Sequence, residues 1–474
     1  MGGVCGVYSL NGPVIFDLLK ATQRLQHLGQ DWSGIALTDN RSNSDPIKYI
    51  VKPGTVRNEF SLDYIADEKD GNYIPKEKFS GHVGMGVTNP AEKQPMCLTS
   101  KIGQFALAFD GKILNADKLK QEFFDRGQAL YRGSEVEILM KLVTRGSAET
   151  GNIIEGIKYM NNKIVGSNST VVLHNNDIYA CRDSYAVNPL QIGESENLLI
   201  VSSETDSIRR TGAKFIRDVA PGEIIRLSEN GIESVFSMPS KKLAHCAFRP
   251  MYTSRADAVL DGINSDLVRK KIGAWHMEQD LKEGLRLDFT TGMQMSGTSY
   301  GLGAQIASMK LFPIYGHFVP YNEAFLYDRY SGRSYILDTQ FMRDMMAGEK
   351  VSVMEHNVEG KSFSLYDDSI VRLTVLVNKV KALFDAGAKE VHARIGFPPL
   401  IDTCLLNVST KKKEELAIYK YKDVDGICEK LGATSLRYIP ENVLMDILPE
   451  GTNLTKNDFC TYCITSENPL LVEA

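Results

Sequence analysis

The chain has 474 residues, and since single domains usually hold about 100 to 200 residues, two substantial domains are expected. Its apolar fraction of 43% and charged fraction of 24% are typical of a globular protein. Its net charge of -5 excludes a general electrostatic attraction to nucleic acid or to an anionic membrane. Because the sequence has neither an apolar run of the ~18 residues that cross a bilayer nor a secretory signal, we expect a cytoplasmic protein that binds neither nucleic acid nor a membrane.

Residues 1–238 are predicted to form packed sheets with a few helices. Short β-rich runs separated by Gly, Asn and Asp turns begin at Phe105, Ser169, Leu198 and Glu223. Apolar residues recur at helical spacing over 15–28, which predicts a helix there. A second helix is predicted over 115–127, with Asn115 as its N-cap.

Residues 239–474 show longer helices that alternate with short apolar strands. The clearest case is IVRLTVLVNKVKALFDAGAKEVHARI at 370–395, which predicts a helix that ends at Gly387 and is followed by a strand. This alternation is typical of a parallel α/β domain. The change of pattern places the domain boundary near residue 240.

Cys5 is a candidate nucleophile. It lies in VCGVYSLNG, and the predicted helix after it ends in LQHLGQDWSGIAL. Taken alone, a cysteine with apolar neighbours is usually a small buried residue. The whole segment resembles the class II glutamine amidotransferase signature, CG(I/V)xG followed by LQHRGQDxAGI, whose N-terminal cysteine is activated by its own α-amine. For Cys5 this role would require the removal of Met1 to Val4.

Three further segments of the first half carry the same resemblance. GHVGMGVTNPAEKQPM (81–96), FDGKILNADKL (109–119) and RDSYAVNPLQIG (182–193) resemble the family patterns GIGHxRYxT, HNGNLTNAxEL and RDPxGIRPLxLG. The resemblance implies that Asp110 and Gly111 take the place of the Asn-Gly pair that forms the oxyanion hole. An ionised Asp110 would repel an oxyanion, and losing one such donor typically costs ~2.7–4 kcal/mol.

Other family residues of the first half are also replaced. The stretch Val87 to Asn89 contains no counterpart of the arginine of HxRYxT. Leu28 stands in place of the arginine of RGQD, and Asn188 in place of the arginine of GIRPL. Glu135 stands in place of the aspartate of TSDSEIL.

The segment SFSLYDDSIVRLT (362–374) is the sharpest motif of the second half. By itself it fits a solvated turn with helix-capping carboxylates. It also resembles the loop VDDSIVRGTT of type I phosphoribosyltransferases, which binds phosphoribosylpyrophosphate. The resemblance implies that Asp367 and Asp368 hold the ribose hydroxyls, and that Ser369, Thr374 and backbone amides cradle the 5′-phosphate at a helix N-terminus. Leu373 stands where the family has glycine.

Two more segments of this half resemble parts of a phosphoribosyltransferase site. RYSGRSYI (329–336) resembles NRYVGRTFI, which opens a loop that closes over substrate. MSGTS (295–299) replaces the Pro-(Asp/Glu)-(Ser/Thr) motif on the pyrophosphate side.

Eight widely spaced cysteines do not form the dense framework of a small disulfide-rich protein. Cys460 and Cys463 form a CxxC pair, which by spacing alone fits zinc, a redox pair or no metal, and four cysteines fit tetrahedral zinc equally well. The surroundings of Cys246, Cys404 and this pair resemble C-x-M-E-Y-I-Y-F-x-R-P-D, SPPIxHPCFYGID and the terminal CxxC of an iron-sulfur subclass. That resemblance implies a four-iron four-sulfur cluster held by these four thiolates.

Taken together, the motifs identify the chain as a divergent member of the glutamine phosphoribosylpyrophosphate amidotransferase family, iron-sulfur subclass. The resemblance implies an Ntn-hydrolase αββα sandwich over 1–238 and a type I phosphoribosyltransferase α/β domain with a cluster-binding segment over 239–474. It also implies transfer of glutamine-derived ammonia to phosphoribosylpyrophosphate, giving 5-phosphoribosylamine for purine synthesis. Mg²⁺ is expected to bind the pyrophosphate, and the protein is expected to form a homo-oligomer.

Two other hypotheses stay open from the sequence. In one, a catalytically degenerate paralogue keeps the fold and cluster and has a regulatory or ligand-binding role. In the other, only the phosphoribosyltransferase half is active, and it uses free ammonia.

Overall fold

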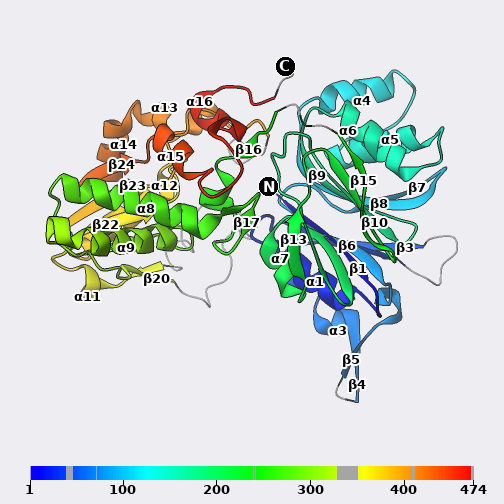
Figure 1. Cartoon of the computed structure of the whole chain (residues 1–474), viewed down its shortest axis with the longest axis horizontal. Coiled ribbons are helices and arrows are strands. Elements are labelled where there is room, and N and C mark those ends of the chain that lie inside the picture. Colours follow the sequence, from blue (N-terminus) through cyan, green and yellow to red (C-terminus); the bar gives the residue numbers. More distant parts are fainter. Residues whose placement is uncertain are drawn as a thin grey trace.

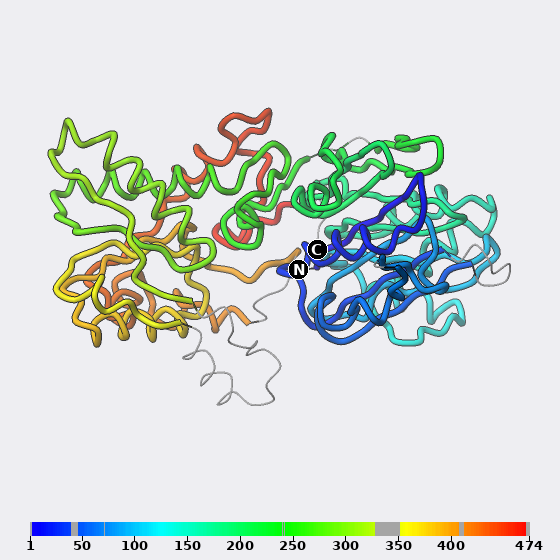
Figure 2. The backbone as a smooth tube through the Cα atoms, turned by 90° about the horizontal axis from the view of Figure 1, so that it is seen from below, coloured from blue at the N-terminus to red at the C-terminus, as the bar shows by residue number. Residues whose placement is uncertain are grey.

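The computed structural model describes residues 2–38, 46–70, 72–238, 240, 242–327, 351–406 and 412–470. It has two lobes, one built from each half of the chain, and the first strand begins where the lobes meet (Figures 1 and 2). The predicted substrate-loop segment 329–336 lies outside the described residues. Within the described ranges, no helix is long and apolar enough to cross a membrane.

The first lobe contains two antiparallel sheets that face each other. The seven-stranded sheet has the order β13 (Lys214–Asp218), β11 (Gln191–Ser195), β12 (Leu198–Ser202), β1 (Gly3–Ser9), β6 (Val83–Asn89), β2 (Trp32–Thr38) and β3 (Ile47–Pro53). The six-stranded sheet has the order β15 (Gly231–Ser237), β14 (Glu223–Ser228), β10 (Asp177–Arg182), β9 (Gly166–His174), β8 (Gly103–Ile113) and β7 (Met96–Ser100).

Helices cover the outer face of each sheet. The seven-stranded sheet packs against α1 (Ile15–Arg24) and α7 (Thr205–Arg210), and the six-stranded sheet packs against α4 (Ala116–Phe124), α5 (Glu135–Ser147) and α6 (Ile153–Lys163). A third apolar layer, with residues from both sheets, fills the space between them. The lobe is therefore the αββα sandwich that the resemblance implies.

Strand β1 shows how the sandwich sorts its side chains. Successive side chains of a strand point to opposite faces. Val4 accordingly packs between the sheets, whereas Cys5 and Val7 pack on the other face, against α1. Because both faces are covered, nearly every residue of β1 is buried.

The second lobe is built on a parallel sheet with helices on both faces, as the alternating pattern predicts. The sheet has the order β19 (Phe289–Gly292), β22 (Ser362–Asp367), β23 (Glu390–Ile395) and β24 (Ser435–Tyr438). One face packs against α8 (Ser265–Lys282), α9 (Gly297–Tyr315) and α15 (Glu441–Ile447), and the other packs against α12 (Thr374–Asp385) and α14 (Val424–Leu431).

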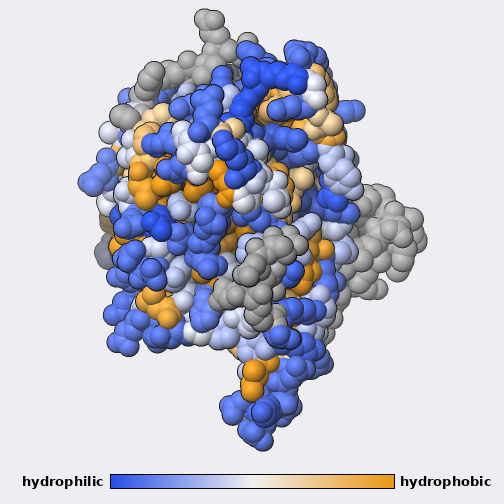
Figure 3. All heavy atoms as spheres, turned by 90° about the vertical axis from the view of Figure 1, so that its right-hand side faces the viewer, coloured by the Kyte–Doolittle hydropathy of each residue, from blue (hydrophilic) through white to orange (hydrophobic). Residues whose placement is uncertain are grey.

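Short elements complete the chain. The hairpin of β4 (Ala66–Lys69) and β5 (Asn72–Pro75) projects from the first lobe and carries mostly hydrophilic side chains (Figures 1 and 3). The others are α2 (Val56–Glu59), α3 (Leu62–Ile65), η1 (Glu77–Phe79), β16 (His245–Cys246), η2 (Arg249–Thr253), β17 (Val259–Leu260), β18 (Ile263–Asn264), β20 (Phe325–Tyr327), β21 (Val351–Val353), α11 (Glu355–Val358), η4 (Lys413–Glu415), α13 (Ala417–Tyr421), η5 (Lys456–Asp458), β25 (Phe459–Cys460) and α16 (Tyr462–Thr465).

The predicted helices occur, with shorter ends. The helix predicted over 15–28 ends at Arg24 and continues as a turn. Asn115 is at the N-cap position of α4, but its side chain does not cap the helix; it bonds to the backbone of Lys163 and Val165 instead. Helix α12 ends at Asp385, and Gly387 adopts the positive φ of 87° that turns the chain toward β23.

Candidate functional site

A pocket of about 140 Å³ lies at the beginning of β1. The predicted oxyanion-hole residues Asp110 and Gly111 line it, as does Glu135. Gly2, which immediately precedes β1, also lines the pocket. Its backbone N–H donates to Asp110 Oδ1 over 2.7 Å. Gly111 has a φ of 156°, and a Cβ there would lie 2.0 Å from the Ser167 carbonyl oxygen, so the position requires glycine.

The structure does not bring Cys5, the predicted nucleophile, to this pocket. The Cys5 side chain is fully buried in the layer between the seven-stranded sheet and α1, and its Sγ lies 3.3 Å from Thr22 Oγ1. Burial raises the pKa of this thiol to about 11, although the Thr22 contact lowers it in part. A protonated thiol without access to the pocket is a packing residue, which is the ordinary role of an isolated buried cysteine.

Asp110 is held by an arginine from the other half of the chain. Arg249 Nη2 lies 3.4 Å from Asp110 Oδ2 and donates to Asn188 Oδ1 over 2.8 Å. Asn188 in turn donates to the Asp110 backbone carbonyl. Asp110 is 3% exposed and Arg249 2% exposed, so the ion pair is screened from water. Arg249 was not among the predicted site residues, because its partners are 61 and 139 residues away in the sequence.

The predicted phosphoribosyl site forms one loop at the carboxyl end of β22. Asp367 ends that strand, and Asp368 and Ser369 follow before α12 begins at Thr374. Ser369 Oγ donates to Asp368 Oδ1 over 2.7 Å, and Ser296 of the predicted pyrophosphate-side segment also donates to Asp368. The fold therefore brings the 295–299 and 367–374 segments together at the end of the parallel sheet, where α/β folds usually bind ligands.

Leu373 does not fill this loop, although the family pattern has glycine there. Its backbone adopts the left-handed conformation with a φ of 69°, which costs a non-glycine residue about 1–2 kcal/mol. Its side chain is buried with those of Ile370 and Leu376 in the core of the second lobe. The loop thus keeps a glycine-like backbone while the leucine side chain points away from the N-terminus of α12.

The two carboxyl groups of the loop are strongly coupled. Burial, and then the charge of Asp368, raise the pKa of Asp367 well above its ordinary value; burial also raises the pKa of Asp368, against the Ser296 and Ser369 hydrogen bonds. Two adjacent carboxyl groups of this kind do not ionise independently. In the absence of a ligand, the loop is therefore a source of instability at neutral pH.

Asp367→Asn should stabilise the protein more at about pH 8 than at about pH 5. Below the unfolded-state pKa of ~3.9, a carboxyl group whose folded-state pKa is raised is protonated in both states and does not lower the free energy of unfolding. As the pH rises from this value toward the folded-state pKa, the free energy of unfolding falls. Melting temperatures of wild type, Asp367→Asn and the surface control Asp117→Asn, measured at both pH values, would check this. An equal gain at the two pH values would show that Asp367 is ionised throughout.

The four predicted cluster cysteines line one cavity of about 230 Å³ where the lobes meet. Cys246 of β16 and Cys460 of β25 are register partners in a parallel pair, and Cys404 and Cys463 complete the lining. Burial, and then the nearby Cys246, raise the pKa of Cys460 to about 12. None of the cysteines forms a disulfide. Among the described residues, no three His, Cys, Asp or Glu side chains are grouped closely enough to bind a single metal ion.

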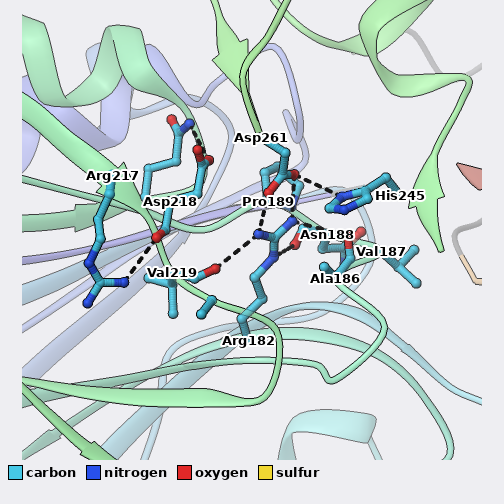
Figure 4. Close-up of polar contacts among 12 residues, drawn as sticks. Arg182, Ala186, Val187, Asn188, Pro189, Arg217, Asp218, Val219, His245 and Asp261 are labelled. Atoms are coloured by element: carbon cyan, nitrogen blue, oxygen red, sulfur yellow. Dashed lines mark hydrogen bonds and ion pairs between the residues drawn. The ribbon is translucent and has the colours of Figure 1, made fainter. Parts of the chain in front are cut away.

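A buried network next to this cavity joins the two lobes (Figure 4). Arg182, at the end of β10, donates through both terminal nitrogens to Asp261, with both distances 2.7 Å. His245, beside Cys246, lies 3.0 Å from the same carboxylate. Burial alone would raise the pKa of Asp261, but the Arg182 charge holds it well below the ordinary range. Arg182 is the first residue of the motif at 182–193. Only the fold shows that it connects β16, the strand that carries Cys246, to the first lobe.

Comparisons with known proteins agree with this arrangement. Residues 82–210 match the glutamine amidotransferase domain family. The chain is 31% identical to an amidophosphoribosyltransferase of Archaeoglobus fulgidus, over 100% of this chain and 98% of that relative. It is 29% identical to that of Bacillus subtilis, over 98% and 94%. The solved structure of B. subtilis glutamine phosphoribosylpyrophosphate amidotransferase complexed with ADP and GMP superposes with a TM-score of 0.85 at 27% identity, covering 98% of this chain and 97% of that one.

Proposed function

The chain belongs to the amidophosphoribosyltransferase family, and we propose that it transfers nitrogen to the anomeric carbon of phosphoribosylpyrophosphate, giving 5-phosphoribosylamine and pyrophosphate. The relatives' names supply the reaction class, and full-length coverage extends it to both halves of this chain. In the B. subtilis relative the substrates are those in its name, glutamine and phosphoribosylpyrophosphate. For this chain the nitrogen source is either glutamine or ammonia.

The observation that carries this proposal is the loop between β22 and α12. Adjacent carboxylates at the end of a parallel strand, followed by a tight turn into a 12-residue helix, have the chemistry to bind a ribose 5-phosphate. Asp367 and Asp368 would accept hydrogen bonds from the ribose hydroxyls. The backbone amides at the start of α12, with Ser369 and Thr374, would bind the phosphate at the positive end of the helix dipole.

The residues of this loop would also position the substrate for the reaction. Holding the ribose hydroxyls and the 5′-phosphate at two points would fix the orientation of the ring, and with it the position of the anomeric carbon that reacts. Ser296, at the pyrophosphate-side segment, keeps the Asp368 carboxylate in position through its hydrogen bond. Mg²⁺, carried in with the substrate, would neutralise the pyrophosphate leaving group.

We also propose that Cys246, Cys404, Cys460 and Cys463 hold a four-iron four-sulfur cluster. The fit rests on four thiols from three distant segments that line one cavity. A water molecule needs only ~10–15 Å³ of such space, whereas this cavity has about 230 Å³. Thiolate ligation suits iron-sulfur clusters, and such a group would cross-link three distant segments of the second half. A homo-oligomer stays a prediction.

Pyrophosphate release tests the enzymatic proposal. Purified protein with phosphoribosylpyrophosphate, Mg²⁺ and either glutamine or ammonium chloride should release pyrophosphate. Asp367→Asn should lower the rate roughly 10- to 100-fold, because a hydrogen bond to a charged group contributes about 1.5–3 kcal/mol. Asp385→Asn, at the exposed far end of α12, is the matched control and should not change it. No pyrophosphate with either nitrogen source, or an unaffected Asp367→Asn, would contradict the proposed site.

A further inference from the structure

The pocket at the beginning of β1 has the position of a glutaminase site but lacks its reactive group. The residue beside Asp110 and Gly111 is Gly2, which has no side chain. Among the described residues that line the pocket there is no cysteine, serine or threonine. A side chain at Gly2 would also be crowded, since its Cβ would lie 2.7 Å from the Thr88 carbonyl oxygen.

Cys5 cannot supply the missing thiol. It is three residues further along β1, on the face that packs against α1, and it is fully buried there. A one-residue register change of β1 would break its pairing with both β6 and β12 and would move every side chain of the strand to the opposite face. The thiol therefore has no small-amplitude path into the pocket.

The predicted oxyanion position is occupied by Asp110, and both of its carboxyl oxygens have a partner. Asp110 Oδ1 accepts from Gly2, and Oδ2 faces Arg249. A tetrahedral intermediate develops negative charge on its oxygen. A carboxylate at that place opposes the charge, whereas an amide would stabilise it.

Three residues around the predicted oxyanion position differ from the family patterns, and their charges compensate one another. Where the family patterns have asparagine, arginine and glutamate, this chain has Asp110, Asn188 and Arg249. The summed charge of the three positions is zero in both sets, and here the three side chains form one buried hydrogen-bonded group. A site that decayed at random would leave an unbalanced buried charge, which is costly. The three side chains form a buried contact between the lobes beside the pocket.

We propose that the nitrogen donor of this chain is ammonia itself and not the amide of glutamine. This inference rests on the proposed phosphoribosyl transfer. The ammonia lone pair forms the C–N bond at the anomeric carbon while the C–O bond breaks and its electron pair leaves with pyrophosphate. The additional proton on nitrogen passes to solvent. No thioester forms and no glutamate is released, and the first lobe serves to hold the second through Arg249 and Arg182.

The test measures pyrophosphate and glutamate with phosphoribosylpyrophosphate, Mg²⁺ and either glutamine or ammonium chloride. Ammonium chloride should support the reaction, with a rate that increases with pH as ammonium loses its proton. Glutamine should give a rate at least ~10³-fold lower, as expected for loss of a nucleophile. Cys5→Ala should leave the ammonium-dependent rate unchanged. An electrophilic glutamine analogue should add no mass to the intact protein.

The outcomes separate this inference from the proposed function. Glutamate release from glutamine, or an adduct of the analogue on any residue of the first lobe, would overturn the choice of donor even if pyrophosphate is formed. Pyrophosphate with ammonium chloride alone supports it. Pyrophosphate from neither source would overturn the proposed function, and the choice of ammonia with it.

Discussion

Asp110→Asn is expected to lower the free energy of unfolding by about 3–5 kcal/mol, the usual cost of breaking a buried ion pair from one side. Arg249 is 2% exposed, and its Nε and Nη1 atoms have no hydrogen-bond partner in the described part of the chain. Among the residues that the structure describes, Asp110 is the one ionic partner of Arg249, and Asn188 supplies one neutral acceptor. Removing the carboxylate leaves a guanidinium charge buried without compensation. Chemical denaturation followed by fluorescence would measure the change.

Two variants show whether the charge causes the loss. Asp117→Asn removes a carboxylate from a surface pair with Lys120, and a change below ~0.5 kcal/mol is expected there. The double variant Asp110→Asn/Arg249→Met removes both charges, so it should recover most of the stability lost in the single variant. If Asp110→Asn unfolds at the same denaturant concentration as wild type, the pair contributes nothing and the buried contact between the lobes loses its energetic basis.

The fold was accessible from the sequence because its signals are local and repeated. Strand runs such as that at Ser169 and the helix-to-strand pattern over 370–395 each match the structure, and the motifs lie on the elements expected. The loop proposed to bind the phosphoribosyl group could be located from the sequence for the same reason, since Asp367 to Thr374 are consecutive. The effect of Leu373 could not be judged from the sequence, because only the structure shows that its side chain packs into the core of the second lobe.

The burial of Cys5 could not be predicted from the sequence, for a physical reason. A cysteine followed by glycine and alternating apolar residues has the same local pattern whether it opens a strand or lies inside one. Its accessibility is decided by the register of β1 between β6 and β12, which is a long-range property. Arg249 and Asp261 were missed for a related reason, since their partners Asp110 and Arg182 are distant in sequence and belong to the other lobe.

Replacing Cys463 by serine is expected to remove the metal cluster and to destabilise the protein strongly. Anaerobically purified wild type should contain about four iron and four sulfide per chain, and Cys463→Ser should contain almost none. Loss of a metal site is among the few changes that cost more than ~4 kcal/mol, which corresponds to a melting temperature lower by roughly 8–16 °C. Iron, sulfide and zinc analysis with thermal unfolding would measure both effects.

Cys428→Ser is the matched control, because Cys428 does not line the cavity and its substitution should change neither metal content nor melting temperature appreciably. The four cluster residues are contributed by β16, the chain around Cys404 and the terminal segment, so a bound cluster would cross-link positions that are far apart in sequence. Wild-type protein that binds zinc in place of iron would keep the cross-link but identify the metal site as mononuclear. Wild-type protein without any metal would mean that the four thiols only pack together, and that the Arg182–Asp261–His245 network alone fixes this strand to the first lobe.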